Sequence, residues 1–218
     1  KRGIRLPDIR RELPLLLVSG IAMGLNWVFL FEAYRYTTVS VATLSYYFAP
    51  ILVTVVCPFL FRERMTGRQL LCSCMSTIGL ILIIGVSGFG RSGTDLIGIA
   101  FGLGAAVFYA AVILLNKFIK QVTGIHRTFL QFLSAILILS PYVLMTGGVN
   151  LGDLSGSGWI NLLIVGLFHT GVTYCMYFSS LRELPGQEAA ILSYMDPLVA
   201  VIVSVAFLNE SITGFQII

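Results

Sequence analysis

The stretch SVATLSYYFAPILVTVVCPFLF, residues 40–61, runs for 22 residues without one charged side chain. A helix rises about 1.5 Å per residue and the hydrocarbon core of a bilayer is about 30 Å thick, so about 20 apolar residues can cross it. Basic side chains follow at once, at Arg62, Arg64 and Arg68. This stretch is therefore predicted to be a membrane-spanning helix that ends at a charged loop.

The composition extends this prediction to the whole chain. Of its 218 residues, 57% are hydrophobic and 11% are charged, against about 25% charged in soluble domains. We expect an all-α polytopic membrane protein; the composition argues against a soluble enzyme, a nucleic-acid-binding module or a disulfide scaffold. Apolar runs bounded by charge, glycine or proline predict seven complete transmembrane helices, at 13–34, 40–61, 69–88, 96–119, 129–146, 159–181 and 187–208. A truncated eighth helix is expected to begin at Ile212.

Basic residues gather on one side of the expected membrane. Successive loops alternate between the two sides, and twelve of the 14 Lys and Arg residues then lie on the same side. The other side holds only Arg35 and Arg91. Cytoplasmic loops carry an excess of Lys and Arg, so we expect the Lys1 end and the loops Arg62–Arg68 and Lys117–Arg127 to be cytoplasmic.

Two parts of the chain resemble each other at an offset of 147 residues. Residues 13–71 align without a gap with residues 160–218, and 14 of the 59 aligned pairs are identical, among them Pro50 with Pro197. Five spans separate the two copies, so they enter the membrane from opposite sides. Inverted repeats of this kind are typical of secondary transporters. The expected architecture is a 5+5 inverted-repeat ten-helix bundle, of which this chain would lack two N-terminal helices and the last helix.

Two stretches also resemble a known family. The first is FEAYRYTTVSVATLSYYFAP at 31–50, which continues to FRERMTG at 61–67. The second is ILSYMDPLVA at 191–200, which continues to LNESITG at 208–214. They resemble the EamA family of the drug/metabolite transporter superfamily. The resemblance implies two inverted five-helix repeats around a central cavity, and the movement of small metabolites, commonly outward.

The resemblance also predicts how the chain is divided. Residues 1–88 would be the last three helices of the first EamA repeat, residues 89–95 the linker, and residues 96–218 four helices and the start of the fifth in the second repeat. The expected location is the cytoplasmic membrane of a bacterium, with the lipid bilayer and a small-molecule substrate as partners. No nucleic acid, cofactor or metal is expected, and the four cysteines lie in apolar runs that indicate no redox role.

Asp196 is the sharpest candidate for transport chemistry. It lies at the centre of the span 187–208, where an ionised side chain costs about 2.5 to 3.5 kcal/mol on insertion scales. Loss of hydration favours the neutral acid. Asp196 could therefore take up a proton on one side of the membrane and release it on the other, or it could bind a substrate ammonium. A neutral Asp hydrogen-bonded to a neighbouring helix is the structural alternative.

Prolines and tyrosines lie near the same depth. Pro50 and Pro197 are at span centres and are expected to break their helices, because proline lacks an N–H and clashes with the carbonyl four residues earlier. A packing kink is the alternative interpretation. Tyr46, Tyr47 and Tyr194 offer aromatic faces and hydroxyl groups to a cation or a ring. We expect these residues to line the substrate site.

Three further candidates lie in two other spans. His169 is at the centre of the span 159–181 and is either a proton partner for Asp196 or a histidine packed against helix backbone. Asn26 and Trp27 lie at similar depth in the span 13–34, where Asn more often joins helices by hydrogen bonds. These three are weaker candidates than Asp196.

Local pairs predict how the helices pack. Glu32 and Arg35 are three residues apart and are expected to form an ion pair at the end of the first span. The small-residue patterns Gly20-x-x-x-Gly24 and Gly98-x-x-x-Gly102 permit close helix contact. That contact would lie within one molecule or in the interface of a homodimer.

The whole pattern favours a secondary active transporter over an enzyme. It would export small organic metabolites by alternating access, with proton coupling through Asp196 as one form of the hypothesis. A membrane-embedded enzyme is the first alternative, but it would need converging groups, and the predicted spans hold one midplane Asp and one midplane His. A passive channel or a non-transporting scaffold is the second.

Overall fold

The described part of the chain is all helical, as expected. The computed structural model describes residues 6–37, 39–62, 66–67, 70–71, 74–75, 77–79, 95–122, 124–148, 151–192, 195–196 and 199. Five helical segments in these residues are long and apolar enough to cross a membrane: Arg10–Tyr36, Val41–Phe61, Asp95–Phe118, Ile125–Met145 and Gly156–Leu181. They coincide with five of the seven expected spans. The expected spans 69–88 and 187–208, and the start of the eighth, lie largely outside the described residues.

The helices group into two compact units. The first unit contains residues Lys1–Val28 and Ala111–Leu184, and the second contains Phe29–Ala110 and Pro185–Ile218. The described elements, in chain order, are α1 (Leu6–Tyr36), α2 (Val39–Tyr46), α3 (Ala49–Phe61), α5 (Asp95–Phe118), α6 (Ile125–Met145), η1 (Leu151–Asp153), α7 (Gly156–Leu163), η2 (Ile164–Val172), α8 (Thr173–Glu183) and α9 (Gly186–Leu192).

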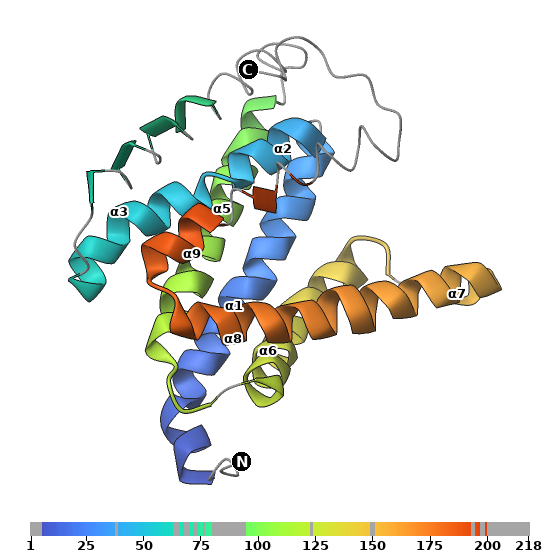
Figure 1. Cartoon of the computed structure of the whole chain (residues 1–218). Coiled ribbons are helices and arrows are strands. Elements are labelled where there is room, and N and C mark those ends of the chain that lie inside the picture. Colours follow the sequence, from blue (N-terminus) through green and yellow to red (C-terminus); the bar gives the residue numbers. More distant parts are fainter. Residues whose placement is uncertain are drawn as a thin grey trace. The chain divides into compact units, whose positions relative to one another are not determined.

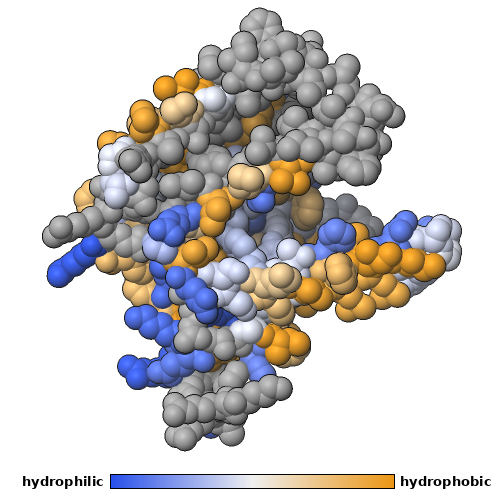
Figure 2. Space-filling model, viewed as in Figure 1, coloured by the Kyte–Doolittle hydropathy of each residue, from blue (hydrophilic) through white to orange (hydrophobic). Residues whose placement is uncertain are grey.

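One long rod of the first unit is barely buried. α7, η2 and α8 follow one another without a gap (Figure 1), and α8 packs against α6. Only 6% of the most apolar window in this rod is buried, and apolar side chains make up much of its visible surface (Figure 2). In a bilayer such a surface meets hydrocarbon at no cost, so the rod needs little packing to be stable.

Charged side chains fasten the connection between α5 and α6 in the first unit. The Glu12 carboxylate accepts hydrogen bonds from the backbone N–H groups of Lys120, Gln121 and Val122 at 2.7 to 3.0 Å. The Arg127 guanidinium donates to three carbonyls, at 2.5 Å to Ile119, 2.9 Å to Val122 and 3.2 Å to Phe178 of α8. Arg127 is therefore not a loop cation as the charge count assumed. It lies in α6 with 1% of its surface exposed. Its planar guanidinium can be buried because its N–H groups donate to backbone carbonyls that would otherwise lack partners.

A buried polar cluster joins three helices of the first unit. Asn116 of α5 donates to the Ser19 hydroxyl of α1 at 3.1 Å, and the Gln131 amide of α6 donates to Ser19 at 2.7 Å and to the Asn116 oxygen at 3.1 Å. All three side chains are at most 1% exposed. Polar side chains at helix contacts in a membrane form specific interhelical hydrogen bonds, because hydrocarbon offers them no alternative partner.

The second unit is held by contacts of α1, α2, α3, α5 and α9. Thr37, which follows α1, donates to the Asp95 carboxylate at the start of α5 at 2.9 Å. The Phe29 ring lies edge-on to Phe101 and Phe108 of α5, with centroids 5.6 and 5.1 Å apart. α9 packs along α3 (Figure 1). The expected Glu32–Arg35 ion pair is confirmed at 2.9 Å.

Both glycine patterns lie at helix contacts within the chain. A Cβ atom on Gly20 would collide with the Gln131 carbonyl oxygen of α6, and one on Gly24 would lie 3.0 Å from the Ala135 carbonyl oxygen. In the second unit, a Cβ on Gly102 would lie 2.7 Å from Ser45 of α2. The prediction of close helix contact is confirmed, and these contacts are intramolecular.

Replacement of Gly20 by valine is expected to destabilise the first unit, because the new side chain overlaps backbone that cannot rotate away. Overpacking of this kind costs roughly 1–3 kcal/mol. Thermal unfolding of the purified protein in detergent measures the effect. Gly166→Ala is the matched control, since nothing lies within 4 Å of a Cβ at Gly166. Equal melting temperatures for Gly20→Val and the wild type would contradict the packing assigned to α1 and α6.

Replacement of Arg127 by methionine is expected to lower the free energy of unfolding by roughly 1–3 kcal/mol, the scale of losing hydrogen bonds from a charged donor to buried carbonyls. Arg127→Lys should recover part of the loss, because an ammonium keeps the charge but not the planar fork. Lys120→Met, at an exposed position, is the control. Unfolding by detergent titration measures all three variants, and a methionine variant as stable as the control would show that the three carbonyl contacts contribute nothing.

Candidate functional site

A helix break interrupts the second predicted span in the second unit. α2 ends at Tyr46 and α3 begins at Ala49, so Tyr47 and Phe48 lie between them. The Phe48 amide bonds to the Ser45 carbonyl at 3.2 Å, three residues back instead of four. The break directly precedes Pro50, which has no N–H to offer the Tyr46 carbonyl. The backbone therefore leaves regular helix geometry near the middle of this span.

Four tyrosines lie around this break. The Tyr46 ring is 5.1 Å from Tyr109 of α5 and 5.7 Å from Tyr47, between centroids. Tyr34 of α1 shares a hydrogen bond of 3.3 Å with the Thr43 hydroxyl, and it interacts electrostatically with Tyr47. Tyr109 and Tyr34 were not among the predicted site residues. Tyr109 could have been found, because it lies near the middle of the predicted span 96–119, at the depth of Tyr46 and Tyr47.

Asp196 interacts with one of these tyrosines. It lies in a short described helical stretch after α9, is exposed, and interacts electrostatically with Tyr47, from a segment about 150 positions away in the sequence. The other two residues predicted for this region, Tyr194 and Pro197, lie outside the described residues.

The buried hydroxyls next to the break are occupied by backbone. Ser45 donates to the Val41 carbonyl and Thr54 donates to the Pro50 carbonyl, each at 2.8 Å. Both side chains are at most 2% exposed. They hold the two half-helices in shape.

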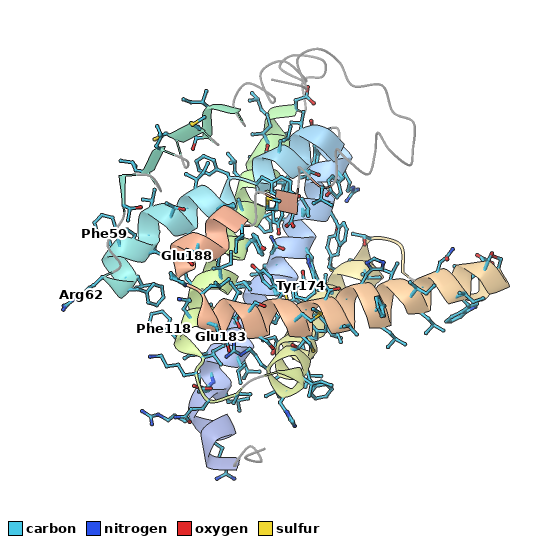
Figure 3. The ribbon with its side chains drawn as sticks, in the orientation of Figure 1. Phe59, Arg62, Phe118, Tyr174, Glu183 and Glu188 are labelled. Atoms are coloured by element: carbon cyan, nitrogen blue, oxygen red, sulfur yellow. The ribbon has the colours of Figure 1, made fainter. Side chains whose placement is uncertain are left out.

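The remaining predicted residues belong to the first unit. Trp27 packs against Phe132 at 6.1 Å and edge-on against Tyr174 at 5.9 Å between ring centroids (Tyr174 is labelled in Figure 3). Asn26 is 3% exposed in α1. His169 is exposed and lies in η2, a nine-residue π-helix. Sequence analysis did not foresee this π-helix, a rare geometry found often at functional sites.

An apolar groove lies between α6 and the η2–α8 part of the rod. Its volume is about 670 Å³, and its polar lining residues are Thr128, Cys175 and Ser179. No charged side chain lines it, so it offers nothing to orient a charged ligand. Among the described residues, no group of three or more His, Cys, Asp or Glu side chains converges to hold a metal ion.

Comparison with known proteins identifies the family. The EamA-like transporter family matches residues 2–85 and 96–218 of the chain. An uncharacterized transporter of Bacillus subtilis (strain 168), YxxF, is 34% identical over 95% of this chain and 64% of its own length. The threonine/homoserine exporter RhtA of Salmonella typhimurium is 26% identical over 95% of this chain and 67% of its own length.

A solved crystal structure shares the fold. It superposes with a TM-score of 0.78 at 19% identity, over 96% of this chain and 77% of that chain.

This chain spans about two thirds of the length of the first relatives, 64% of the Bacillus subtilis protein and 66% of an uncharacterized transporter of Clostridium kluyveri. The family match covers nearly every residue from 2 to 218, and the chain is an integral membrane protein that belongs to the EamA-like transporter family.

Proposed function

We propose that this chain carries the substrate site of a secondary active transporter that exports small organic metabolites. Its family and the names of its relatives support transport as the activity, and one relative is named as an exporter of two amino acids. The observation that carries the proposal is the place of Asp196 beside Tyr47 at a helix break. Broken helices near the midplane are where transporters build their binding sites.

The proposed mechanism is alternating access between two related halves. The 14 identical pairs at an offset of 147 residues support an inverted repeat, with residues 1–88 in one copy and 96–218 in the other. Two related halves can exchange conformations and open a shared site to either side of the membrane. The small-residue contacts of α1 with α6 and of α5 with α2 would let helices slide past one another without rebuilding a bulky interface.

Proton coupling through Asp196 is part of the proposal. A carboxylate at the midplane is stable when protonated and available for a cation when ionised. The described titratable group that interacts with it is Tyr47. Tyr47 carries no positive charge, so it does not hold Asp196 in the ionised form. Protonation and substrate binding would then alternate at one carboxylate.

The proposed orientation follows from the basic residues. Without the buried Arg127, eleven Lys and Arg residues lie on one side and two on the other, so the Lys1 end and the α5–α6 connection face the cytoplasm. The connection between α6 and α7 then faces outward. The bacterial cytoplasmic membrane is the proposed location, in keeping with the Bacillus and Salmonella relatives.

Asp196→Asn is expected to abolish the dependence of flux on a pH gradient, and to slow flux at least tenfold, because an amide cannot carry a proton between the two sides. Efflux from proteoliposomes that contain the protein measures both effects. Glu32→Gln, which removes a carboxylate from a pair at a helix end, is the matched control. Wild-type pH dependence in Asp196→Asn would remove proton coupling from the proposal. Passive, unsaturable flux would favour a channel.

A sidedness test uses two exposed residues on either side of α6. In a background without native cysteines, Lys120→Cys should react with a membrane-impermeant maleimide only after the cells are permeabilised. Ser155→Cys should react on intact cells, because one span separates the two positions. Both residues are exposed in the structure, so a failure to label cannot be ascribed to burial within the chain. The reverse labelling pattern would invert the proposed orientation.

A further inference from the structure

Trp27 and Tyr174 are counterparts in the two copies of the internal repeat. They are 147 positions apart, the offset at which residues 13–71 align with residues 160–218, and each lies within four residues of the centre of its predicted span. They are also in contact within the first unit, where their ring centroids are 5.9 Å apart and their ring planes stand at 89°. A residue of one copy thus touches its own counterpart in the other copy.

A contact between counterparts has a geometric meaning. Two copies related by a twofold axis lie at equal distances on opposite sides of it, so a residue and its counterpart meet only where both reach the axis. The α1 helix and the rod of α7, η2 and α8 cross at the Trp27–Tyr174 contact (Figure 1). In inverted-repeat transporters the axis that relates the repeats lies in the membrane plane. The pair therefore marks where this axis passes through the first unit.

The second unit contains a similar contact between two other spans. The span 187–208 is the counterpart of the span 40–61 at the same offset. α9 belongs to the first of these spans and α3 to the second, and α9 packs along α3. In each unit, a helix of one copy therefore packs against the counterpart of its own span, and neither unit is a single copy of the repeat.

We propose that the Trp27–Tyr174 pair is the pivot of alternating access. The proposal rests on the transport function proposed above and names the residues about which its two halves turn. When two inverted copies exchange their conformations, each contact passes to the counterparts of the residues that made it. The contact of Trp27 with Tyr174 passes to Tyr174 and Trp27, which is the same contact. It is therefore kept in the inward-open and the outward-open state, whereas contacts away from the axis can differ between the two states.

The surroundings of the pair suit a pivot. The Phe132 ring of α6 lies 6.1 Å from Trp27 and 5.4 Å from Tyr174, and the Phe178 ring lies 5.5 Å from Tyr174, between centroids. Aromatic rings attract one another over a range of offsets and tilts, so these rings can rock without losing a bond of fixed direction. The hydrogen-bonded polar cluster of the same unit has less freedom, because hydrogen bonds weaken steeply as they bend.

A reversible cross-link tests the pivot. In a background without native cysteines, Trp27→Cys and Tyr174→Cys are joined by a short bifunctional methanethiosulfonate. Efflux of radiolabelled amino acids and amines from proteoliposomes is measured before cross-linking, after it, and after reduction. Flux after cross-linking should be at least as high as before, because the link replaces a contact that is kept through the cycle. Flux that stops on cross-linking and returns on reduction overturns the proposal.

Tyr174→Cys alone, treated with the same reagent, is the control for modification without a link. If the double variant is inactive both with and without the link, single substitutions decide instead.

Those single substitutions distinguish a pivot from a substrate-binding residue, the role predicted for Trp27 from the sequence. Trp27→Leu should lower the maximal rate of efflux at least fivefold and leave the KM unchanged, because the substrate does not touch the pivot. Tyr174→Phe keeps the ring and should behave like the wild type. Phe168→Leu, which removes an exposed ring from the same rod, is the matched control. A raised KM with an unchanged maximal rate in Trp27→Leu would make Trp27 a binding residue and overturn the proposal.

The wild-type protein separates this proposal from the transport function. If the wild type moves none of these solutes under any gradient, the transport function fails and the pivot fails as well. If the wild type and the unlinked double variant transport but the cross-linked protein does not, the transporter stands and the pivot is wrong. Sustained flux through the cross-linked protein supports both.

Discussion

Hydrocarbon offers no hydrogen bonds, so every polar group that enters the membrane-spanning part of this chain must be satisfied by the protein itself. The structure meets this constraint in three ways. Ser45 and Thr54 return their hydroxyls to carbonyls of their own helices. Ser19, Asn116 and Gln131 satisfy one another across three helices. Glu12 and Arg127, two charged side chains, bond to backbone at the connection between α5 and α6 instead of to water.

Two groups depart from this pattern. The Gln131 side-chain oxygen is buried without a hydrogen-bond partner, although the same amide donates twice. Its orientation is fixed by the Asn116 oxygen, which requires a donor, and Asn116 is fixed in turn by the Val112 carbonyl. Asp196 is exposed in a described helical stretch after α9 and interacts electrostatically with Tyr47. The buried Gln131 oxygen is a local cost of packing, whereas the Asp196 carboxylate is accessible.

Close packing and a broken helix place these groups. Glycine at positions 20, 24 and 102 brings helix backbones into direct contact, which leaves no room for a side chain between them. Between α2 and α3, Tyr47 and Phe48 interrupt the regular α-helix. The π-helix that holds His169 is a second irregularity, on a rod that packs little against its own unit. Regular helices form the scaffold, and two of the predicted site residues, Tyr47 and His169, lie where the helices depart from regular geometry.

Hydropathy alone determined the all-helical class and the position of five spans to within a few residues, because crossing a bilayer requires a certain length and composition in each local stretch of the chain. The Glu32–Arg35 pair and the glycine contacts were equally local signals. Only the tertiary structure decided which distant residues meet. Tyr109 beside Tyr46, Gln131 bonded to Ser19 across 112 positions, and the burial of Arg127 all depend on how helices pack against one another. A hydropathy pattern predicts that a helix crosses the membrane, but it does not identify the helices that it packs against. Lipid tails are as apolar as the apolar side chains of a neighbouring helix, so hydrophobicity does not select the neighbour. Shape complementarity and a few interhelical hydrogen bonds do.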